Sequence, residues 1–268
     1  MRVVALLAVR NEALCLERCL AHLHAQGIET CVIDNESTDA TQAIARSFLG
    51  RGVFRIDHLP YKGFFDLVEQ LQCKERLARE IDADWFLHVD ADEIREAPTR
   101  WRTLAEAIGA VDAQGCNAIN FDEFVFLPTS DSDAFEGTDY VERMRYYYFF
   151  EPDALRRINA WKRQAQPVEL TSSGGHRVQF EGRRIFPENF ILRHYIVLSR
   201  GHAIAKYGRD RVYSSAEIDE RGWHGARPRF DPGMLKFPDK ALLKRVDRGR
   251  WDKSDPWRTH SFMEAVPK

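Results

Sequence analysis

The sequence has no hydrophobic run long enough to cross a membrane. A transmembrane helix needs roughly 20 consecutive apolar residues, whereas the apolar run near the N-terminus covers only residues 3–9. That run leads straight into Arg10 without a cleavage signature, so it predicts a buried strand rather than a secretory signal. With 44% hydrophobic and 30% charged residues, the 268-residue chain is expected to be a soluble, cytoplasmic globular protein.

Cysteine is sparse and scattered. The chain has 5 cysteines, an odd number. Cys15 and Cys19 lie within a helical pattern, and Cys31 lies within a strand pattern. No spacing matches a zinc site or a disulfide framework. We therefore expect buried thiols in a reducing cytosol.

Several ligand-binding motifs are also absent. No glycine-rich phosphate loop is present, which argues against a nicotinamide cofactor. Nothing resembles a nucleic-acid-binding motif, so no nucleic acid partner is expected. A calcium-binding EF-hand loop that starts at Asp90 is excluded, because Arg95 stands where that loop requires glycine.

The net charge of −2 conceals an uneven distribution along the chain. Residues 1–140 contain 13 Lys and Arg against 25 Asp and Glu, a net charge of −12, whereas residues 141–268 contain 26 against 16, a net charge of +10. The basic half is interpreted as a solvated surface that complements the acidic half, as a phosphate-binding region, or as a peripheral contact with an anionic membrane.

The first half alternates between predicted strands and helices. Strands are expected at residues 2–9, 30–34, 53–57, 85–90 and 117–127. Helices are expected at residues 13–26, 40–48, 63–82 and 98–110, the last opened by Pro98. Repeated β-α units predict an α/β fold whose mostly parallel sheet is flanked by helices.

The second half is less regular. An exposed loop is expected at residues 131–137, and a flexible Ser-Ser-Gly-Gly turn precedes His176. Aromatic strands are expected at residues 144–152 and around Trp161, a further strand at residues 190–200 and a helix at residues 203–214. From residue 222 onward, Gly, Pro and charged residues dominate, which predicts a peripheral tail.

Polar clusters follow three of the predicted strands. Residues 10–12 follow the first strand, residues 34–39 follow the second, and residues 90–93 follow the fourth. In parallel α/β sheets, ligands bind beyond the carboxyl ends of the strands. We therefore expect all three clusters to open onto one edge of the sheet.

The stretch Asp90-Ala91-Asp92-Glu93 places three acids within four residues. Two carboxylates about 4 Å apart repel by roughly 4 kcal/mol at an effective dielectric of 20. On extended backbone Asp90 and Asp92 would point the same way, and a divalent cation would remove their repulsion. The alternative is a set of solvated acids, one of which caps the next helix. A haloacid-dehalogenase-type phosphotransferase also uses Asp-x-Asp, but Ile94 stands where that motif has Thr or Val.

The second cluster, in VIDNESTDAT, has two readings. Ser37, Thr38 or Asp39 can cap the following helix through a side-chain oxygen. Capping leaves Asp34 and Asn35 unexplained. A carboxylate at that strand end is well placed to accept hydrogen bonds from a ribose or a base edge.

Three motifs occur in an order that resembles a known protein family. VRNEA, DNESTDAT and VDADE, spread over roughly residues 2–125, resemble a family 2 glycosyltransferase of the GT-A fold. DNESTDAT and the later ILRHY (residues 191–195) resemble a bacterial subgroup with D-N-x-S-x-D-x-T and R-H-Y motifs.

The resemblance implies a nucleotide-sugar donor, a Mn²⁺ or Mg²⁺ cofactor and a set of site residues. Asp90 and Asp92 would hold the metal on the diphosphate, with His176 or His194 as a further ligand. Asp122 or Glu123 would act as the general base of an inverting reaction, although the family's usual Glu-Asp base motif has no clear match. The nucleotide-sugar contacts implied are Arg10, Asn11, Glu12, Asp34, Asn35, Asp39, Lys74 and Asp90.

The sequence thus predicts transfer of a UDP-linked sugar to a glycan or lipid-phosphate-linked acceptor. We expect residues 1–127 to bind the nucleotide sugar, residues 128–221 to form the acceptor side and residues 222–268 to form the tail. Two rivals remain, a metal-dependent phosphotransferase or nucleotidyltransferase and a noncatalytic glycan-binding protein of the same fold. The intact pair Asp90 and Asp92 argues against the second, because an inactive site has no need to keep that repulsion.

Overall fold

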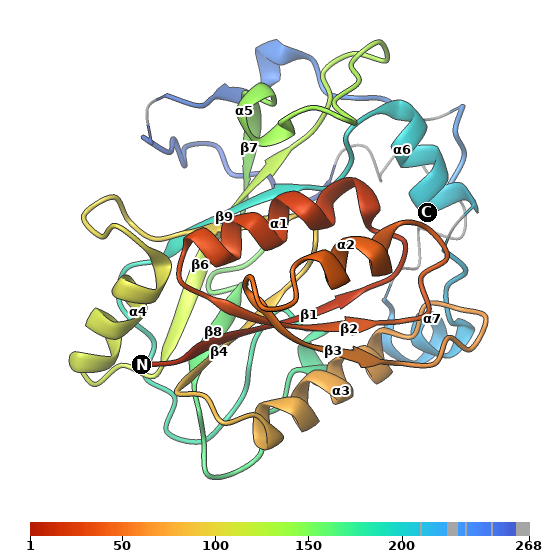
Figure 1. Ribbon diagram of the computed structural model, residues 1–268. Coiled ribbons are helices and arrows are strands. Elements are labelled where there is room, and N and C mark those ends of the chain that lie inside the picture. The colour runs from red at the N-terminus through yellow and green to blue at the C-terminus, as the bar shows by residue number, and fades with distance from the viewer. Residues whose placement is uncertain (210, 224–229, 234, 248, 261–268) are drawn as a thin grey trace. The chain divides into compact units, whose positions relative to one another are not determined.

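The structure is a computed structural model that describes residues 1–268 except 210, 224–229, 234, 248 and 261–268 (Figure 1). Its chain folds into two compact units, each assembled from separate stretches. The first unit comprises Met1–Pro60, Leu67–Asp122 and Leu155–Leu192. The second unit comprises Tyr61–Asp66, Glu123–Ala154 and Arg193–Lys268.

Four parallel strands form the centre of the first unit, in the order β4-β1-β2-β3. Their bounds are β1 Val3–Val9, β2 Glu29–Asp34, β3 Val53–His58 and β4 Trp85–Val89. Beyond β4 the sheet continues with antiparallel β8 (Ile158–Lys162) and then β6 (Ala118–Phe126). The predicted α/β class, with a mostly parallel sheet, is confirmed.

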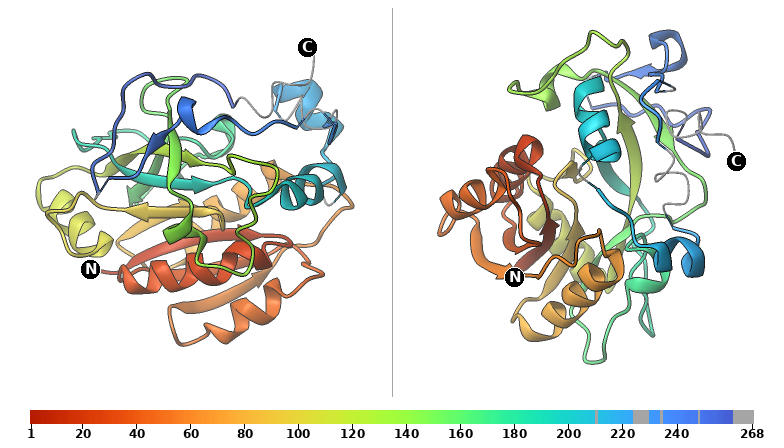
Figure 2. Two further views of the ribbon diagram at one scale, coloured as in Figure 1. Left: turned by 90° about the horizontal axis from the view of Figure 1, so that it is seen from above. Right: turned by 90° about the vertical axis from the view of Figure 1, so that its right-hand side faces the viewer.

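Helices cover both faces of this sheet, as the β-α alternation predicts. The helices of the unit are α1 Ala13–Ala25, α2 Thr41–Ser47, α3 Leu67–Glu80 and α4 Leu104–Ala113. Helices α1 and α2 lie together over one face and α3 lies over the other (Figures 1 and 2). Apolar side chains at helical spacing explain the packing, since α1 buries Cys15, Leu16, Cys19, Leu20 and Leu23.

Two elements of this unit differ from the sequence expectation. Helix α4 begins at Leu104 rather than Pro98, because Thr103 caps it by accepting a hydrogen bond from the Glu106 amide at 3.1 Å. A short strand, β5 (Glu93–Glu96), follows the acidic stretch and pairs with β9 (Phe190–Tyr195). Its sequence, EIRE, is too polar to predict a buried strand.

The second unit contains the remaining elements. Residues Glu123–Phe126 of β6 pair antiparallel with β7 (Tyr146–Phe150), which pairs with β10 (Lys244–Arg245). The helical elements are α5 Tyr140–Arg143, α6 Arg200–Ile204, the π-helix η2 Ala205–Arg209, α7 Ser215–Arg221 and the 3-10 helix η4 Lys240–Leu242. The helix expected at residues 203–214 is therefore shorter, starts earlier and passes into a π-helical turn.

Aromatic side chains fill much of the second unit. Phe126 stacks on Tyr195 with ring centroids 4.7 Å apart, and Trp251 lies 4.4 Å from Phe124. Described parts of the predicted tail thus contribute to the packing of this unit. Among the described residues, no helix combines the length and apolar character that crossing a membrane requires.

Candidate active site

The loops that follow β1 and β2 are hydrogen-bonded to each other. The Arg10 guanidinium donates to the Asn35 carbonyl at 2.6 Å, and Asn11 Oδ1 accepts from the Thr38 amide at 2.8 Å. Because β1 and β2 end in register at Val9 and Asp34, the first two polar clusters meet at one edge. This expectation is confirmed.

Two non-glycine residues in these loops have left-handed backbone conformations. Asn11 has a φ of 54° and Glu36 a φ of 53°. Such conformations cost of order 1–3 kcal/mol and persist where surrounding contacts determine them. The bonds made by Arg10 and Asn11 provide those contacts, so this edge is locally strained and held in place.

The predicted nucleoside-binding residues lie within this cross-linked edge. Asp34 is buried, and its carboxylate accepts from Gln42 Nε2 at 2.7 Å and from the Ser37 amide at 3.3 Å. Asn35 donates to the carbonyls of Leu59 and Pro60 at 3.0 and 3.1 Å. These bonds fix the end of β2 before any ligand is bound.

Helices α1 and α2 begin at the same place. The Asp39 carboxylate accepts from the amides of Thr41 and Ala13, at 2.9 and 3.2 Å, and thereby joins the two helix starts. The Glu12 amide donates to Thr41 Oγ1 at 2.8 Å. Asp39 therefore holds the start of α2 through its carboxylate, although the N-cap residue of that helix is Ala40 rather than the predicted Ser37, Thr38 or Asp39.

The acidic stretch after β4 forms a turn rather than extended strand. Strand β4 ends at Val89, and the Glu93 amide donates to the Asp90 carbonyl at 3.1 Å. Glu93 also accepts from the Asp90 amide at 3.1 Å through its carboxylate, which closes the turn from the side chain. The expectation that Asp90 and Asp92 lie on extended backbone is thus wrong, although the charge of Asp92 still raises the pKa of Asp90.

The three acids are not equivalent. The Asp90 side chain is 51% exposed, whereas that of Glu93 is 1% exposed. Glu93 forms a buried ion pair with Arg95, with 2.6 Å between Oε2 and Nη2. The repulsion expected in this stretch is therefore relieved in part by the protein itself, and Glu93 is neither solvated nor available to a metal.

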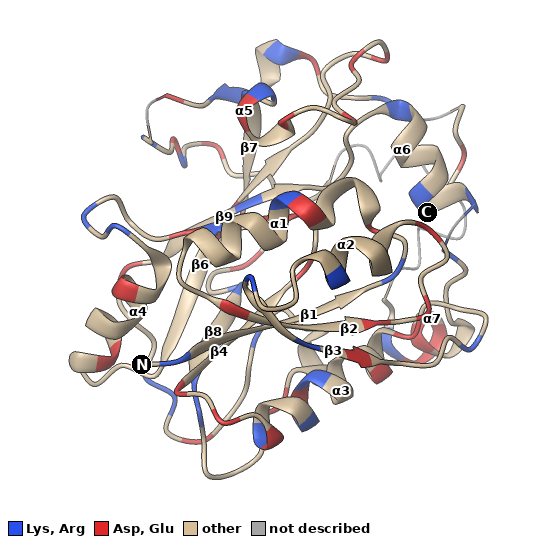
Figure 3. Ribbon diagram, in the orientation of Figure 1, with Lys and Arg blue, Asp and Glu red and all other residues tan. Residues whose placement is uncertain are grey.

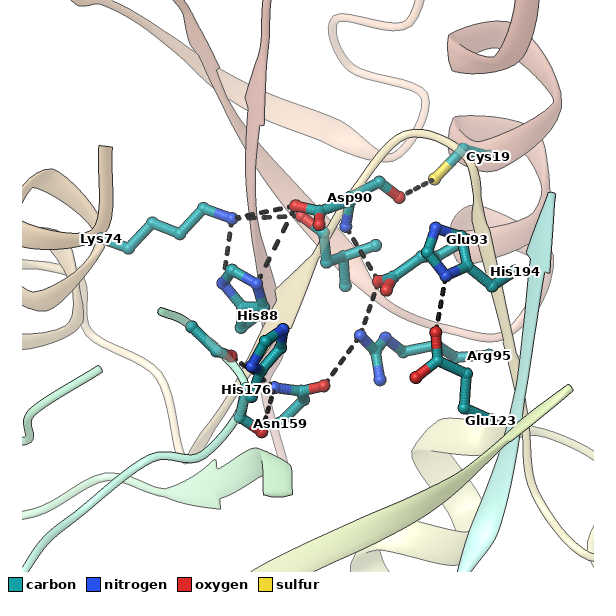
Figure 4. A network of polar contacts seen from close by, with 12 residues as sticks. Cys19, Lys74, His88, Asp90, Glu93, Arg95, Glu123, Asn159, His176 and His194 are labelled. Atoms are coloured by element: carbon teal, nitrogen blue, oxygen red, sulfur yellow. Dashed lines mark hydrogen bonds and ion pairs between the residues drawn. The ribbon is translucent and has the colours of Figure 1, made fainter. Parts of the chain in front are cut away.

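Arg95 extends this network below the turn (Figure 4). It donates to Asn159 Oδ1 at 3.2 Å, and its guanidinium lies 4.7 Å from the centroid of the Phe121 ring. Asn159 in turn donates to the Gly175 carbonyl at 2.8 Å. The network therefore connects the turn after β4 to the Gly-Gly segment that precedes His176.

A second cation lies on the other side of Asp90 (Figure 4). The Lys74 ammonium, carried by α3, is buried and lies 3.0 Å from His88 Nδ1, 3.2 Å from the Val89 carbonyl and 3.8 Å from Asp90 Oδ1. Sequence analysis placed Lys74 on α3 but missed His88 and Arg95. The one sequence signal for this group of residues is that Lys74 lies on the same helical face as Leu67 and Leu71.

Charges around Asp90 shift the pKa values of this group of residues. Burial raises the pKa of the Asp90 carboxyl, but His88 and Lys74 outweigh it and lower the pKa to about 2. Burial lowers the pKa of His88 well below its usual range, and Lys74 lowers it further. Burial lowers the pKa of Lys74 as well, and the charge of Asp90 opposes that shift.

The predicted histidine ligands and candidate bases have the following contacts. His176 lies in the first unit, with Nε2 3.5 Å from Arg156 Nη2. Asp122 accepts from Asn189 Nδ2 at 2.8 Å. In the second unit, Glu123 Oε1 and His194 Nδ1 lie 2.7 Å apart, within hydrogen-bond distance. Two residues selected for separate roles, Glu123 and His194, are thus brought together.

The donor set at the turn fits a hard divalent cation that keeps other ligands. Asp90 has a half-exposed carboxylate and Asp92 is buried, with 7% of its surface exposed. Carboxylate oxygens are the ligands that Mg²⁺ and Mn²⁺ prefer. Across the part of the chain that the structure describes, no group of three or more His, Cys, Asp or Glu side chains is gathered for a metal. The fit is therefore to a cation completed by water and phosphate oxygens, rather than to a closed protein site.

Comparison with known proteins identifies the family. Residues 5–149 match the family described as Glycosyl transferase family 2, and the chain belongs to it. A protein named "Uncharacterized glycosyltransferase" from Rickettsia bellii (strain RML369-C) is 36% identical over 92 residues, which cover 34% of this chain. The matched region is 28% of that relative's length.

Solved structures with a similar arrangement share little sequence. TarS 1–349 of S. aureus is 12% identical, with a TM-score of 0.47 over 73% of this chain and 60% of that one. The mannosyltransferase PcManGT of Pyrobaculum calidifontis, solved with GDP-Man and Mn²⁺, is 17% identical, with a TM-score of 0.44 over 81% and 66%. The family assignment therefore rests on the sequence match.

Proposed function

We propose that this chain is a metal-assisted glycosyltransferase that moves a sugar from a nucleoside-diphosphate donor, UDP-linked, to a glycan or a lipid-linked acceptor. The observation that carries the proposal is the half-exposed Asp90 carboxylate at the sheet edge where the loops after β1 and β2 are cross-linked. Strands β1, β2 and β4 are adjacent and parallel, so one ligand can contact all three ends.

The donor would bind along this edge. The proposed contacts are Arg10, Asn11, Glu12, Asp34, Asn35, Asp39, Lys74 and Asp90. Asp34 and Asn35 are already held by hydrogen bonds, so the cost of ordering them does not oppose binding. Residues 1–127 would carry this function, with the acceptor on residues 128–221.

Asp90 and Asp92 would hold Mn²⁺ or Mg²⁺, with His176 or His194 as a further ligand. When bound, the cation neutralises charge on the departing diphosphate. Asp90 suits this role because its carboxyl stays ionised, with a pKa of about 2. His176 follows the segment that Asn159 holds through the Gly175 carbonyl, which limits where its imidazole can lie.

The general base of an inverting reaction would be Asp122 or Glu123. Glu123 is buried and bonded to His194, so it would act on the acceptor hydroxyl through that imidazole. Asp122 is bonded to Asn189 and would act directly. Glu123→Gln and Asp122→Asn distinguish them, because loss of the base lowers kcat much more than it raises KM.

The subgroup motifs and the basic composition of residues 141–268 support a bacterial surface-glycan pathway. We infer that the acceptor is a glycan or a lipid-phosphate-linked sugar and that the enzyme works in the cytoplasm, with peripheral contact at an anionic membrane face. These finer assignments rest on sequence patterns alone.

The test is the product of the reaction. The protein is incubated with UDP- and GDP-sugars, Mn²⁺ and a mixed glycan acceptor pool, and release of nucleoside diphosphate is measured by chromatography. We expect nucleoside diphosphate from one donor, and its loss in Asp90→Asn. Arg79→Met, on the exposed face of α3, is the control and should remain active. Release of inorganic phosphate or pyrophosphate instead would favour the phosphotransferase or nucleotidyltransferase reading.

A further inference from the structure

Lys74 is enclosed at the end of β4. Its exposed fraction is 1%, and Leu71 and Leu77 on the same helix are fully buried. On the opposite side, a Cβ added at Gly175 would lie 2.9 Å from Leu71 Cδ2 and 3.0 Å from His88 Cε1, so the Gly175 segment packs tightly over this region. The ammonium is therefore almost fully buried, next to the half-exposed carboxylate of Asp90.

The ammonium meets three acceptors. A Lys side chain has three N–H donors and no acceptor. His88 Nδ1, the Val89 carbonyl and Asp90 Oδ1 lie 3.0, 3.2 and 3.8 Å from Nζ. The first two are uncharged, so Asp90 is the countercharge among these three contacts. Burying a Lys ammonium is costly unless it is paired, which ties the position of Lys74 to the ionised state of Asp90.

We propose that Lys74 is a positioning residue that balances the charge of Asp90 before substrate binds, and that it thereby weakens binding of a bare divalent cation to the site. This inference rests on the proposed function, because it concerns the residues that would hold the donor's metal. It assigns to Lys74 a role through Asp90 that differs from direct contact with the donor.

The local charge balance explains the effect. Glu93 and Arg95 form an ion pair, and the positive charges of Lys74 and Arg157 act on Asp90, so the turn carries less net negative charge than its two aspartates alone would give. A bare cation gains less from that charge than from two carboxylates, and it is repelled by the nearby ammonium. A nucleoside diphosphate carries more negative charge than one divalent cation neutralises, so its metal complex is attracted by Lys74. Metal and nucleotide are therefore expected to bind together.

Electron paramagnetic resonance of Mn²⁺ tests the proposal without an activity assay. Free Mn²⁺ is titrated against wild type and Lys74→Met, each with and without UDP or GDP. Wild type should bind Mn²⁺ weakly alone and much more tightly with one nucleotide. Lys74→Met should bind Mn²⁺ alone about tenfold more tightly, because one nearby positive charge is gone. The increase in Mn²⁺ affinity that the nucleotide produces should therefore be smaller in Lys74→Met than in wild type.

Three further variants make the result specific. Arg79→Met removes a positive charge from the exposed face of the same helix and should leave Mn²⁺ affinity unchanged. Lys74→Gln, whose amide can still donate to Val89, is measured in parallel and guards against loss of the fold. In the double variant Lys74→Met/Asp90→Asn, the increase in Mn²⁺ affinity caused by Lys74→Met should disappear, because Lys74 acts on the metal site through Asp90.

The role of Lys74 and the metal site itself are contradicted by different results. Nucleotide-dependent Mn²⁺ binding in wild type, with unchanged or weaker binding of Mn²⁺ alone in both folded Lys74 variants, would overturn this inference and leave the proposed function standing. An increase in Mn²⁺ affinity on Lys74→Met that persists in the Asp90→Asn variant would also overturn the inference. No Mn²⁺ binding by wild type with either nucleotide would overturn the metal site and this inference together.

Discussion

Glu93 and Arg95 form a buried ion pair directly beneath the turn that carries Asp90. The pair is joined at 2.6 Å, and the side chains are 1% and 0% exposed. Removing one partner leaves an uncompensated buried charge, which typically costs 3–5 kcal/mol. At the scale of single residues, the shape of the candidate metal site therefore depends on a pair that touches no ligand.

Arg95→Met is expected to lower the free energy of unfolding by about 3–5 kcal/mol, because Glu93 loses its countercharge. Urea denaturation followed by circular dichroism measures the change. The double variant Glu93→Gln/Arg95→Met should recover part of the loss, since no buried charge remains. A loss below about 1 kcal/mol in the single variant, the range of exposed ion pairs, would contradict the buried-pair account.

Asp112 links α4 to the core strands through its carboxylate. It accepts from Trp85 Nε1 at 2.9 Å and pairs with Lys162 Nζ at 2.7 Å. Burial raises the pKa of Asp112, but its bonds with Lys162 and Trp85 outweigh burial and lower the pKa. A lowered folded-state pKa means that the stabilisation is present above about pH 4 and is lost as the pH falls through the folded value.

Asp112→Asn should therefore cost about 1 kcal/mol at pH 7 and less as the pH falls below 4. Urea unfolding midpoints from pH 7 down to pH 3 measure this, and the wild-type and variant curves should converge at the acidic end. Asp82→Asn, an exposed acid in the same unit, is the control. Curves that stay parallel throughout would show that the ionised Asp112 carboxylate contributes nothing.

The turn after β4 and the Gly175 segment are the elements that shape the site. Gly175 has a φ of +81°, which side-chain-bearing residues rarely adopt, and its Cα faces Leu71 and His88. The segment is also held by Asn159, which donates to the Gly175 carbonyl. Position 175 is thus constrained both by backbone conformation and by space.

Gly175→Ala should lower the free energy of unfolding by about 2–4 kcal/mol, the sum of the φ cost and overpacking. Gly182→Ala is the matched control, because Gly182 has a φ of +70° and nothing within 4 Å of an added Cβ. Gly182→Ala should lower the free energy of unfolding only by the cost of placing a side chain at positive φ. Equal losses in the two variants, measured by denaturant unfolding, would show that the close approach to Leu71 and His88 is unimportant.

At this same scale, the sequence predicts the parallel strands and the convergence of their polar ends. Apolar runs and helical spacing report burial, and burial dominates where β1, β2 and β4 form. The same signal fails for β5, because its buried face carries Glu93 and Arg95, which satisfy each other. Helical spacing places Lys74 on the buried face of α3 but does not reveal its partners, because His88 and the Val89 carbonyl come from β4. Buried polar pairs made across elements leave no periodicity to find.

For the whole molecule, the charge asymmetry of the sequence does not become an asymmetry between the units. By composition the first unit holds 19 Lys and Arg and 22 Asp and Glu, a net charge of −3, and the second holds 20 and 19, a net charge of +1. Residues 155–192, which are basic, belong to the first unit with most of the acidic half. Figure 3 shows Lys and Arg interspersed with Asp and Glu along the ribbon. Any membrane contact must therefore come from local basic side chains.

The proposed membrane contact predicts more binding to vesicles with anionic lipid than to neutral vesicles at low ionic strength. Because exposed charges are screened over about 10 Å at 0.1 M salt, the excess should fall as salt is added. Co-sedimentation with both vesicle types over a salt series measures this. Equal binding to the two at low salt would contradict the proposed contact and leave the donor site unaffected.

The most direct test of the central claim is calorimetric titration with UDP, GDP, CDP and ADP, each with and without Mn²⁺, on wild type and on Asp92→Ala. The account predicts that one nucleotide binds tightly and that this binding requires both Mn²⁺ and Asp92. Binding of none of the four, or binding indifferent to metal and to the substitution, would contradict the assignment of the turn after β4 as the site that holds the donor's metal.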